Sequence, residues 1–502
     1  MERYRQQIQE LDGLGFPGKT FAGAVLKPVF DTQRDYYYKA FIEISLAHAL
    51  MLHEQGILAK EDADKLIQAL TDIRAVDFSG AEYNPAYEDM FFMIEKELAE
   101  RVGPDVAGRL HIARSRNDID LCEFRMVLRE RLLMLMAELY RLMDVLLALA
   151  QENVDTIMPA YTHTQPAQPT TLAHYLTAFY DALARTQRRL VQAYHNANLC
   201  PIGAAAITTT GFPINRERIC ELLGFDGLVE NSYDAIAGVD YLTEAASALM
   251  VLGTDLSRFL KDTLDFCTYE YAYYRLADPY VQISSIMPQK RNPSSLEHAR
   301  PMASRAVAQA QTVFTMLHNT PFGDMVDSEE QLQPVLYGAF ESIGGVLRLL
   351  ISNFATMTLQ KQRMRERANE GFITATELAD TLVREMGLSF RQAHRITASI
   401  VRRLIAEGKR QSELTREMAA EVIRDELQHD MPLPESVVEK ALDPQNFVEL
   451  RGVTGGPAPH EMRRMLTMRA QSGARDEPMR LSENLRAAEA KLEALLMQYR
   501  RH

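Results

Sequence analysis

Apolar residues recur at helical spacing over long stretches of the chain. Between Asp120 and Ala150 there is no Gly or Pro, and the charged residues within 131–150 follow one another at steps of seven, three and three. This spacing places them on one narrow polar stripe of an otherwise apolar helix. A helix of about 30 residues is about 45 Å long, and one that is apolar over most of its circumference must be surrounded by other helices.

Similar patterns follow along the chain, and the alternation typical of strands is scarce. We expect further long helices over 170–199, 240–276, 294–319 and 330–368, and therefore an all-α fold. The pattern divides the chain into an N-terminal mixed helical domain (1–112), a central bundle of long helices (113–366) and a C-terminal small helical domain (367–502). The bundle has more apolar surface than one chain can bury, which indicates that bundles pack together in an oligomer.

Charge and composition exclude several classes of protein. A net charge of −13 argues against nucleic acid or an acidic membrane surface as the main partner. The most apolar run, 132–150, is interrupted by charged residues and is a poor membrane span. The cysteines lie far apart without a CxxC pair, which indicates neither a zinc site nor a disulfide framework. With no apolar signal-peptide core at its start, the chain is expected to be cytoplasmic.

Residues 13–20, GLGFPGKT, match the phosphate-loop pattern GxxxxGK[ST]. This pattern binds nucleotides only between a buried strand and a helix. Here a polar, helix-like segment precedes it. Gly23 and Pro28 follow, so we expect no helix after the loop. A flexible N-terminal arm is therefore favoured over nucleotide binding.

Three other stretches carry candidate chemistry. The first, SSIMPQKRNP at 284–293, has a proline at each end of its basic residues and is predicted to be a loop rich in hydrogen-bond donors. Ser294 and Glu297 then fit a capping box that begins a helix, whose N-terminus adds positive potential. The alternative interpretation is an exposed basic connector.

The second stretch, HIARSRNDID at 111–120, contains Arg114, Ser115, Arg116 and Asn117 directly before the first long helix. Arginine forks suit carboxylates, although a helix cap with a solvated basic turn explains the same residues. The third, YTHTQPAQPTT at 161–171, holds His163, which is either structural or a group for proton transfer.

Loops at the ends of antiparallel helices can meet, within one chain or between chains. Together the three stretches supply anion clamps, a hydroxyl and an imidazole, with no motif for a metal or a cofactor. This set fits removal of a proton next to a carboxylate, followed by elimination.

The same stretches resemble signature elements of the fumarase/aspartase superfamily. SSIMPQKRNP is similar to the pattern GSSxMPxKxNP, with Ile283 at the leading glycine. HIARSRNDID and YTHTQPAQP are similar to HTGRSRNDQ and YTHLQxAQP of argininosuccinate lyases. Further counterparts, NSYDAI, GFITATELADTLV and GGPAP, extend the likeness over nearly the whole chain.

The resemblance implies a homotetramer of three-domain subunits, active sites built from loops of three subunits, and no cofactor. It implies that Ser284 is the general base, which leaves an aci-carboxylate dianion stabilised by Lys290 and Asn292. It also implies that Thr162, Ser115 and Asn117 hold the succinyl carboxylates. His163 would bind a carboxylate or serve in proton transfer to the leaving amine, with Glu297 as its partner. Arg114 and Arg116 are further candidates for substrate binding, because guanidinium groups suit carboxylates.

The chain departs from argininosuccinate lyases where they hold arginine. Segment 320–334, TPFGDMVDSEEQLQP, has neither the Tyr nor the Lys of that family, and acidic residues predominate. The family's Ser-Asp-Arg-Asp element is Ala237-Gly238-Val239-Asp240, and Ser294 replaces an Asp. A site with this composition should not favour the carboxylate of free arginine.

We therefore expect a lyase that cleaves an N-substituted aspartate to fumarate and an amine other than arginine. The departures suggest similarity to ethylenediamine-N,N'-disuccinate lyases, which act on an aminopolycarboxylate. Argininosuccinate lyase itself is the nearest alternative. A catalytically silent structural protein is an alternative of another class.

Overall fold

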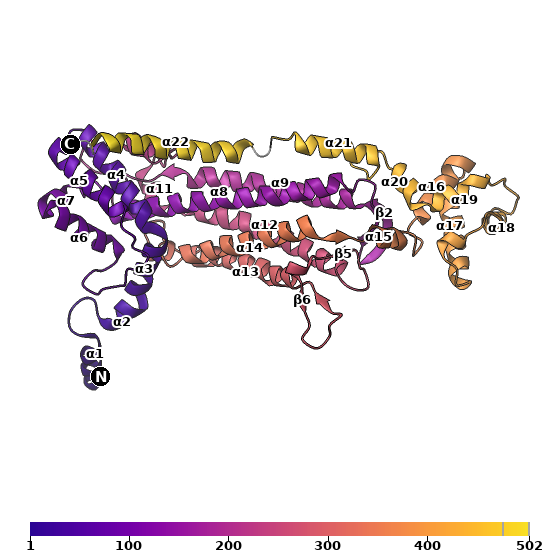
Figure 1. The fold of residues 1–502 in the computed structure, drawn as a ribbon, viewed down its shortest axis with the longest axis horizontal. Coiled ribbons are helices and arrows are strands. Elements are labelled where there is room, and N and C mark those ends of the chain that lie inside the picture. Colours follow the sequence, from indigo (N-terminus) through magenta and orange to yellow (C-terminus); the bar gives the residue numbers. More distant parts are fainter. Residues whose placement is uncertain (474–475, 500–502) are drawn as a thin grey trace.

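The computed structural model describes residues 1–473 and 476–499. Figure 1 shows an elongated molecule whose central bundle separates the N-terminal helices at one end from a smaller helical lobe at the other. The predicted all-α class is confirmed. The division at residues 112 and 366 stays a prediction, and the packing described below is independent of it.

Five long helices form the bundle: α8 (Arg116–Gln151), α9 (Leu172–Ala197), α12 (Asp240–Phe266), α13 (Ser294–Leu317) and α14 (Gln333–Thr356). Their apolar stripes share one large core, which includes Leu139, Leu183, Leu249 and Ile343. Gly253 lets α12 and α13 approach closely, because a Cβ there would lie 2.7 Å from the Val307 side chain. The bundle is therefore the rigid frame from which the candidate loops emerge.

Two predicted helix ranges were too long. The helix predicted over 240–276 ends at Phe266, because the chain turns at 268–272 and continues as strand β5 (Tyr274–Arg275). The range 330–368 contains α14 and α15 (Lys361–Ala368), separated by β8 (Thr358–Leu359), which pairs with β5. Pairing across the end of the bundle thus interrupts what the hydrophobic pattern presented as continuous helix.

Strands are short and occur in pairs in the described residues. They are β1 (Ile157–Thr162) with β2 (Gln165–Thr171), β3 (Leu199–Cys200) with β4 (Gly227–Leu228), β5 with β8, and β6 (Gln282–Ile283) with β7 (Arg291–Asn292). Two of these pairs carry candidate stretches: β6 and β7 hold the first, 284–293, and β1 and β2 hold the third, 161–171.

The stretch Val326–Thr356 is long and apolar enough by composition to cross a membrane, but 56% of its most apolar window is buried inside the molecule. Its buried residues, such as Leu336, Val346 and Leu350, belong to the bundle core. We therefore interpret it as a core helix.

The N-terminal part comprises α1 (Glu2–Asp12), α2 (Lys19–Phe21), α3 (Lys27–Thr32), α4 (Tyr38–Glu54), α5 (Lys60–Arg74), α6 (Met90–Val102) and α7 (Pro104–Arg109). Its core includes Ile42, Leu46, Leu66 and Ile94. The prediction that no helix follows Thr20 was wrong, because α2, α3 and α4 are joined by π-helical turns at 22–26 and 33–37. The wider turn at 22–26 relieves the clash that Pro28 would cause in a regular α-helix. A helix, α1, still precedes residues 13–20, so the context required of a phosphate loop is missing.

The remaining short helices are α10 (Arg216–Leu222), α11 (Ser232–Ala237), α16 (Ala375–Met386), α17 (Phe390–Ala406), α18 (Arg416–Leu427), α19 (Glu435–Leu442) and α20 (Pro444–Glu449). Helices α16 to α19 share a separate core that includes Leu382, Ile396 and Ile423.

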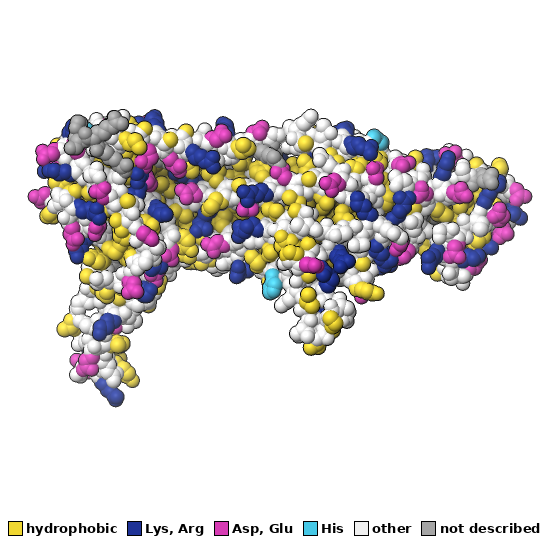
Figure 2. Space-filling model, in the orientation of Figure 1, with side chains coloured by type: hydrophobic (Ala, Val, Ile, Leu, Met, Phe, Trp, Pro, Cys, Tyr) yellow, Lys and Arg dark blue, Asp and Glu magenta, His cyan; other side chains and the backbone are white. Residues whose placement is uncertain are grey.

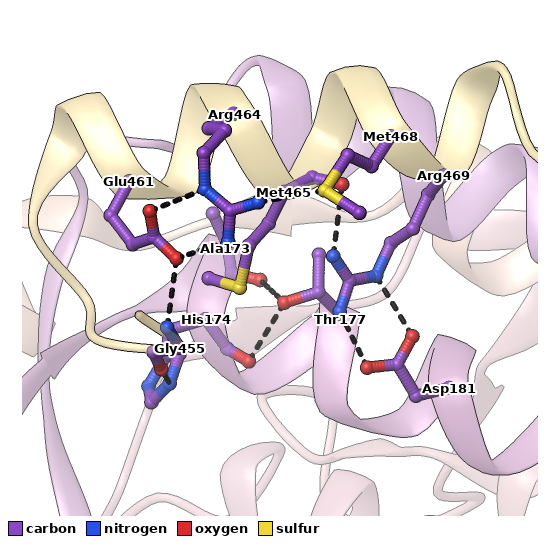
Figure 3. Close-up of polar contacts among 10 residues, drawn as sticks. All are labelled: Ala173, His174, Thr177, Asp181, Gly455, Glu461, Arg464, Met465, Met468 and Arg469. Carbon is purple, nitrogen blue, oxygen red and sulfur yellow. Dashed lines mark hydrogen bonds and ion pairs between the residues drawn. The ribbon is translucent and has the colours of Figure 1, made fainter. Parts of the chain in front are cut away.

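The last two helices, α21 (Pro459–Ala470) and α22 (Asp476–Tyr499), run back along the bundle (Figure 1). Figure 3 shows α21 beside α9, where the Arg469 guanidinium donates to both Asp181 carboxylate oxygens at 2.8 and 2.5 Å. The His174 ring lies between the Thr170 hydroxyl (2.9 Å) and the Gly455 carbonyl (3.0 Å). Leu492 and Leu496 of α22 enter the N-terminal core. The C-terminal segment therefore ties both ends of the molecule to the bundle.

Candidate active site

Residues 115–118 of the second stretch form the N-terminus of α8. Ser115 is the N-cap, its hydroxyl accepts from the Asn117 backbone N–H, and Asp118 accepts from the Ser115 N–H at 2.9 Å. Asp118 also accepts from the backbone of Gly203 and Ala205, both at 2.9 Å. This capping box is the structural role that the sequence left open for Ser115. It places the Asn117 side chain at a helix N-terminus, which favours bound anions.

Arg114 faces the interior. Its side chain is 1% exposed, it donates to the Ser45 hydroxyl at 3.1 Å, and it lies 3.5 Å from the Glu95 carboxylate. Burial lowers the pKa of Arg114 to about 10, an effect that Glu95 and Asp118 oppose. The predicted contact of Arg114 with substrate stays a prediction, whereas these contacts give it a structural role.

Arg116 turns toward a group of carboxylates. It forms an ion pair of 2.7 Å with Asp89 and lies 3.8 Å from Asp120 and from Glu88. Burial lowers the pKa of Arg116, but Asp120 and Asp89 raise it above its ordinary value. Arg116 is therefore held charged at the start of α8.

The acidic segment 324–330 also lies here. Glu330 is buried and accepts from the Gln33 amide at 3.0 Å, and Gln33 in turn accepts from the Met90 backbone next to Asp89. Asp324 and Glu329 are half-buried. Burial, with the carboxylates of Glu330 and Asp324, raises the pKa of Glu329 to about 7. Asp324, Glu329 and Glu330 thus lie close enough to Arg116 to interact with its charge, and none of the three is fully exposed.

Thr162 and His163 occupy the tip of the β1–β2 hairpin. His163 and Thr164 both have positive φ, 51° and 65°, as a tight two-residue turn requires. Both Thr162 and His163 are exposed. The hairpin therefore presents His163 to the surroundings, away from the core of its own chain.

The stretch 284–293 is an exposed hairpin closed by β6 and β7, which Figure 1 shows standing away from the bundle. The Ser284 Oγ accepts from the backbone N–H of Met287 at 3.1 Å and of Ile286 at 3.3 Å. Donors directed at this oxygen favour its deprotonated form. These two donors would stabilise a deprotonated Ser284, a feature that the sequence pattern did not reveal.

The predicted capping box after this loop is wrong. Helix α13 does begin at Ser294, but its N-cap is Pro293, without a side-chain capping bond. The Ser294 hydroxyl contacts the Gln282 amide oxygen at 3.4 Å across the hairpin, so it is turned away from the helix backbone. Glu297 is exposed and forms no ion pair with His163 among the described residues. Glu297 therefore does not cap α13.

One chain does not bring the three stretches together. The 36-residue helix α8, about 54 Å long, separates Ser115 and Asn117 from the hairpin of His163. Helix α13, with 24 residues and about 36 Å, separates the 284–293 hairpin from segment 324–330. What one chain does assemble is the α8 N-terminus with the acidic segment.

The sequence did not indicate the acids around Arg116, namely the buried Asp89 and Glu123 and the partly buried Asp120. Arg116, Asp120 and Glu123 are spaced i, i+4 and i+7, so they lie on one face of α8. Because this segment was predicted to be helical, the spacing alone indicates that the three side chains share a face. The approach of Asp89 and Glu330 comes from tertiary packing and carried no local signal.

Comparison with known proteins agrees with the fold and with the motifs. Residues 31–308 match the Lyase family, and residues 372–449 match the argininosuccinate lyase C-terminal family. The chain is 41% identical to argininosuccinate lyase 2 of Agrobacterium fabrum (strain C58 / ATCC 33970), over 96% of both proteins. EDDS lyase in complex with formate is a structural neighbour, with a TM-score of 0.84, 30% identity and 98% coverage of both chains. A doubly substituted EDDS lyase variant with bound fumarate has a TM-score of 0.83 at the same identity and coverage.

The chain therefore belongs to the fumarase/aspartase superfamily, in its argininosuccinate lyase branch, and is a carbon–nitrogen lyase that releases fumarate.

Proposed function

We propose that this lyase cleaves argininosuccinate to arginine and fumarate. The observation that carries the proposal is the retention of the succinyl-binding and catalytic elements in a chain 41% identical to a protein named argininosuccinate lyase 2. From the sequence alone, an aminopolycarboxylate was the first expectation and argininosuccinate the second. The relatives' names favour the reverse order.

In the proposed reaction Ser284 removes a proton from the carbon next to a carboxylate. The resulting aci-carboxylate dianion is stabilised by Lys290 and Asn292, and the carbon–nitrogen bond then breaks to leave fumarate and the amine. Ser115, Asn117 and Thr162 bind the succinyl carboxylates, with Arg116 adding positive charge. His163 binds a carboxylate or transfers a proton to the leaving amine, and Glu297 is its proposed partner.

We include a homotetramer in the proposal, because the three stretches lie too far apart within one chain. Figure 2 shows hydrophobic side chains over the flank of the bundle. Among the exposed apolar residues of the bundle, Met134 on α8 is 61% exposed and Val251 on α12 is 36% exposed. Packing of several bundles buries such surface and lets loops from different chains meet. A cytoplasmic location is also part of the proposal.

A second candidate substrate is an aminopolycarboxylate such as ethylenediamine-N,N'-disuccinate. Two observations favour it: the likeness to EDDS lyase over 98% of the chain, and the acidic segment 324–330 beside Arg116. That segment suits a cationic amine better than the carboxylate of arginine.

An amine-addition panel tests the proposal. The enzyme is incubated with fumarate and arginine, ethylenediamine or ammonia, and loss of fumarate absorbance is followed. Consumption with arginine supports argininosuccinate lyase. Consumption with ethylenediamine but not arginine supports the second candidate. Consumption with ammonia alone overturns both, because the substrate would then be aspartate itself.

A further inference from the structure

A cavity of about 480 Å³ lies where the 284–293 hairpin joins the end of the bundle. Its walls come from the turn after α12, from β5, from the last residues of the hairpin and from the start of α15. The volume is within the range of about 300–1,000 Å³ that is typical of small-molecule sites. None of the residues proposed to carry the reaction lines this cavity.

The charges on the cavity wall are all positive. Arg275, Arg291 and Arg363 line it, whereas no Asp, Glu or Lys of the described chain does. Figure 2 shows Lys and Arg side chains gathered at the base of the protruding hairpin. Because the whole chain carries a net charge of −13, this wall locally reverses the overall field and favours an anion.

The three guanidinium groups are only partly engaged by the protein. Arg275 is exposed and forms no hydrogen bond or ion pair through its side chain with a described residue. Arg291 pairs with Asp278 at 2.7 Å, but the side chain of that Asp is 86% exposed. Arg363 lies 3.7 Å from the exposed Glu366 carboxylate. Ion pairs with exposed groups contribute little, so an anionic ligand can replace them.

Neutral donors complete the wall, among them the Gln360 amide, the Cys267 thiol and the Tyr274 hydroxyl. Burial raises the pKa of Cys267 to about 12 and raises the pKa of Tyr274 above its ordinary value, so neither adds negative charge near neutral pH. The Tyr274 hydroxyl is buried without a hydrogen-bond partner among the described residues. Most buried hydroxyls have one, so the wall holds a donor that the described protein leaves unused.

The composition of the wall suits a phosphate group with an organic substituent. Arginine forks bind phosphate oxygens through paired hydrogen bonds, and a phosphate monoester carries close to two negative charges at neutral pH. A carboxylate offers only one charge to the same three arginines. Leu276, Val281 and the exposed ring of Tyr269 add an apolar part of the wall, which inorganic phosphate would leave empty.

The cavity also includes the base of the hairpin. Arg291 lies in β7, where it pairs with Ile283, the residue before Ser284. The Arg291 guanidinium donates to the Leu276 carbonyl at 3.0 Å. An anion bound by Arg291 and by Arg363 of α15 would therefore connect the hairpin to the end of the bundle.

We propose that this cavity binds the phosphate group of a small organic phosphate, and that the bound phosphate holds the base of the 284–293 hairpin. Arg275, Arg291 and Arg363 bind the phosphate oxygens, and the apolar wall receives the organic substituent. The inference concerns binding, and it does not depend on which N-substituted aspartate the lyase cleaves.

Titration calorimetry at constant ionic strength tests the site with three probes: phenyl phosphate, inorganic phosphate and benzoate. The proteins are the wild type, Arg275→Gln and Arg363→Gln. Arg365→Gln is the matched control, because Arg365 is exposed on the same helix as Arg363 and does not line the cavity. Asn117→Ala reports binding at the proposed active site instead. Thermal melting verifies that each variant is folded.

We expect the wild type, Arg365→Gln and Asn117→Ala to bind phenyl phosphate equally well. Arg275→Gln and Arg363→Gln should each weaken this binding about tenfold, as the loss of a charge-assisted hydrogen bond predicts. Benzoate should bind at least tenfold more weakly than phenyl phosphate. Inorganic phosphate should also bind more weakly than phenyl phosphate, because it does not fill the apolar part of the wall.

Several results would overturn the inference. Absence of binding, or equal affinities for phenyl phosphate in the wild type, Arg275→Gln and Arg363→Gln, excludes the site. Weaker binding in Asn117→Ala assigns the phosphate to the proposed active site. Equal affinities for benzoate and phenyl phosphate exclude selectivity for phosphate, and tighter binding of inorganic phosphate excludes the organic substituent.

Trypsin cleavage after Lys290 provides a readout of the connection to the hairpin. Phenyl phosphate should slow this cleavage several-fold in the wild type and in Arg365→Gln, and much less in Arg363→Gln. Binding of phenyl phosphate that leaves the cleavage rate unchanged in the wild type would overturn the connection.

Discussion

Ser115 and His163 lie at opposite ends of α8. Ser115 caps the helix at its first residue, and His163 occupies the hairpin that follows its last turn. The 36 residues between Arg116 and Gln151 span about 54 Å. These two residues cannot contact one small substrate within a single chain, so the proposed site, which contains both, requires more than one copy of the chain.

Mixed assemblies test this requirement. Asn117→Ala and Ser284→Ala should each reduce activity about 100-fold or more when expressed alone. When the two variants are co-expressed, some sites receive Asn117 from one chain and Ser284 from another, and we expect activity to return. The measurement is the rate of fumarate release by the purified hybrid.

A matched pair within one loop is the control for the mixed assemblies. Ser284→Ala and Lys290→Ala both alter the 284–293 hairpin. Every chain of their hybrid then carries an altered hairpin, so no site receives an unaltered one and activity should stay low. Hybrids of Asn117→Ala and Ser284→Ala that remain as inactive as their parents would contradict a shared site.

The binding of a cationic amine should strengthen with pH. Burial and the carboxylates of Glu330 and Asp324 raise the pKa of Glu329 to about 7. Glu329 is therefore mostly neutral below this pKa and mostly negatively charged above it. Inhibition by agmatine, which stays protonated throughout, should become several-fold tighter as the pH rises through this pKa. Glu329→Gln should flatten this dependence, and the same slope in both proteins would exclude Glu329 as its source.

Asp118 is predicted to stabilise the start of α8. Its carboxylate accepts three backbone N–H groups, from Ser115, Gly203 and Ala205, each at 2.9 Å. In Asp118→Asn an amide NH2 replaces one acceptor and faces buried donors, which costs about 1–3 kcal/mol of unfolding free energy. Thermal or urea unfolding measures the loss. Asp155→Asn, at an exposed carboxylate beyond the helix, should change stability little.

The 284–293 hairpin is predicted to be a site of proteolysis that ligand protects. Lys290 and Arg291 are exposed, as is Ile286 at 82%. Trypsin should cleave after Lys290 or Arg291 in the free enzyme, and fumarate should slow this cleavage as the loop closes over it. Mass spectrometry of the fragments provides the rates. Protection that is equal at all tryptic sites would indicate general stabilisation instead of closure.

The sequence was informative wherever a local pattern determined the structure. The narrow polar stripe on the otherwise apolar segment 131–150 predicted the longest helix, and two prolines predicted the loop at 284–293. The fit of Ser294 and Glu297 to a capping box failed because the backbone at Pro293, locked by its ring, and a contact across the hairpin direct the Ser294 hydroxyl elsewhere.

Tertiary packing determined the rest of the site. Arg114 and Arg116 lie two residues apart in the same stretch. Arg114 is nevertheless buried against Ser45, whereas Arg116 is paired with Asp89. The approach of Glu330 to α8 depends on how α13 returns the chain to the N-terminal end of the bundle. Neither feature has a signature within a window of neighbouring residues.

The most direct test of the proposed chemistry is the rate of fumarate formation from argininosuccinate by the wild type and by Ser284→Ala. We predict release of fumarate and arginine in equal amounts by the wild type, and a fall in kcat of about 10²–10⁴-fold in Ser284→Ala. Ser304→Ala, at an exposed serine that bonds only its own helix backbone among the described residues, should retain full activity. Undiminished turnover by Ser284→Ala would contradict the assignment of Ser284 as the base.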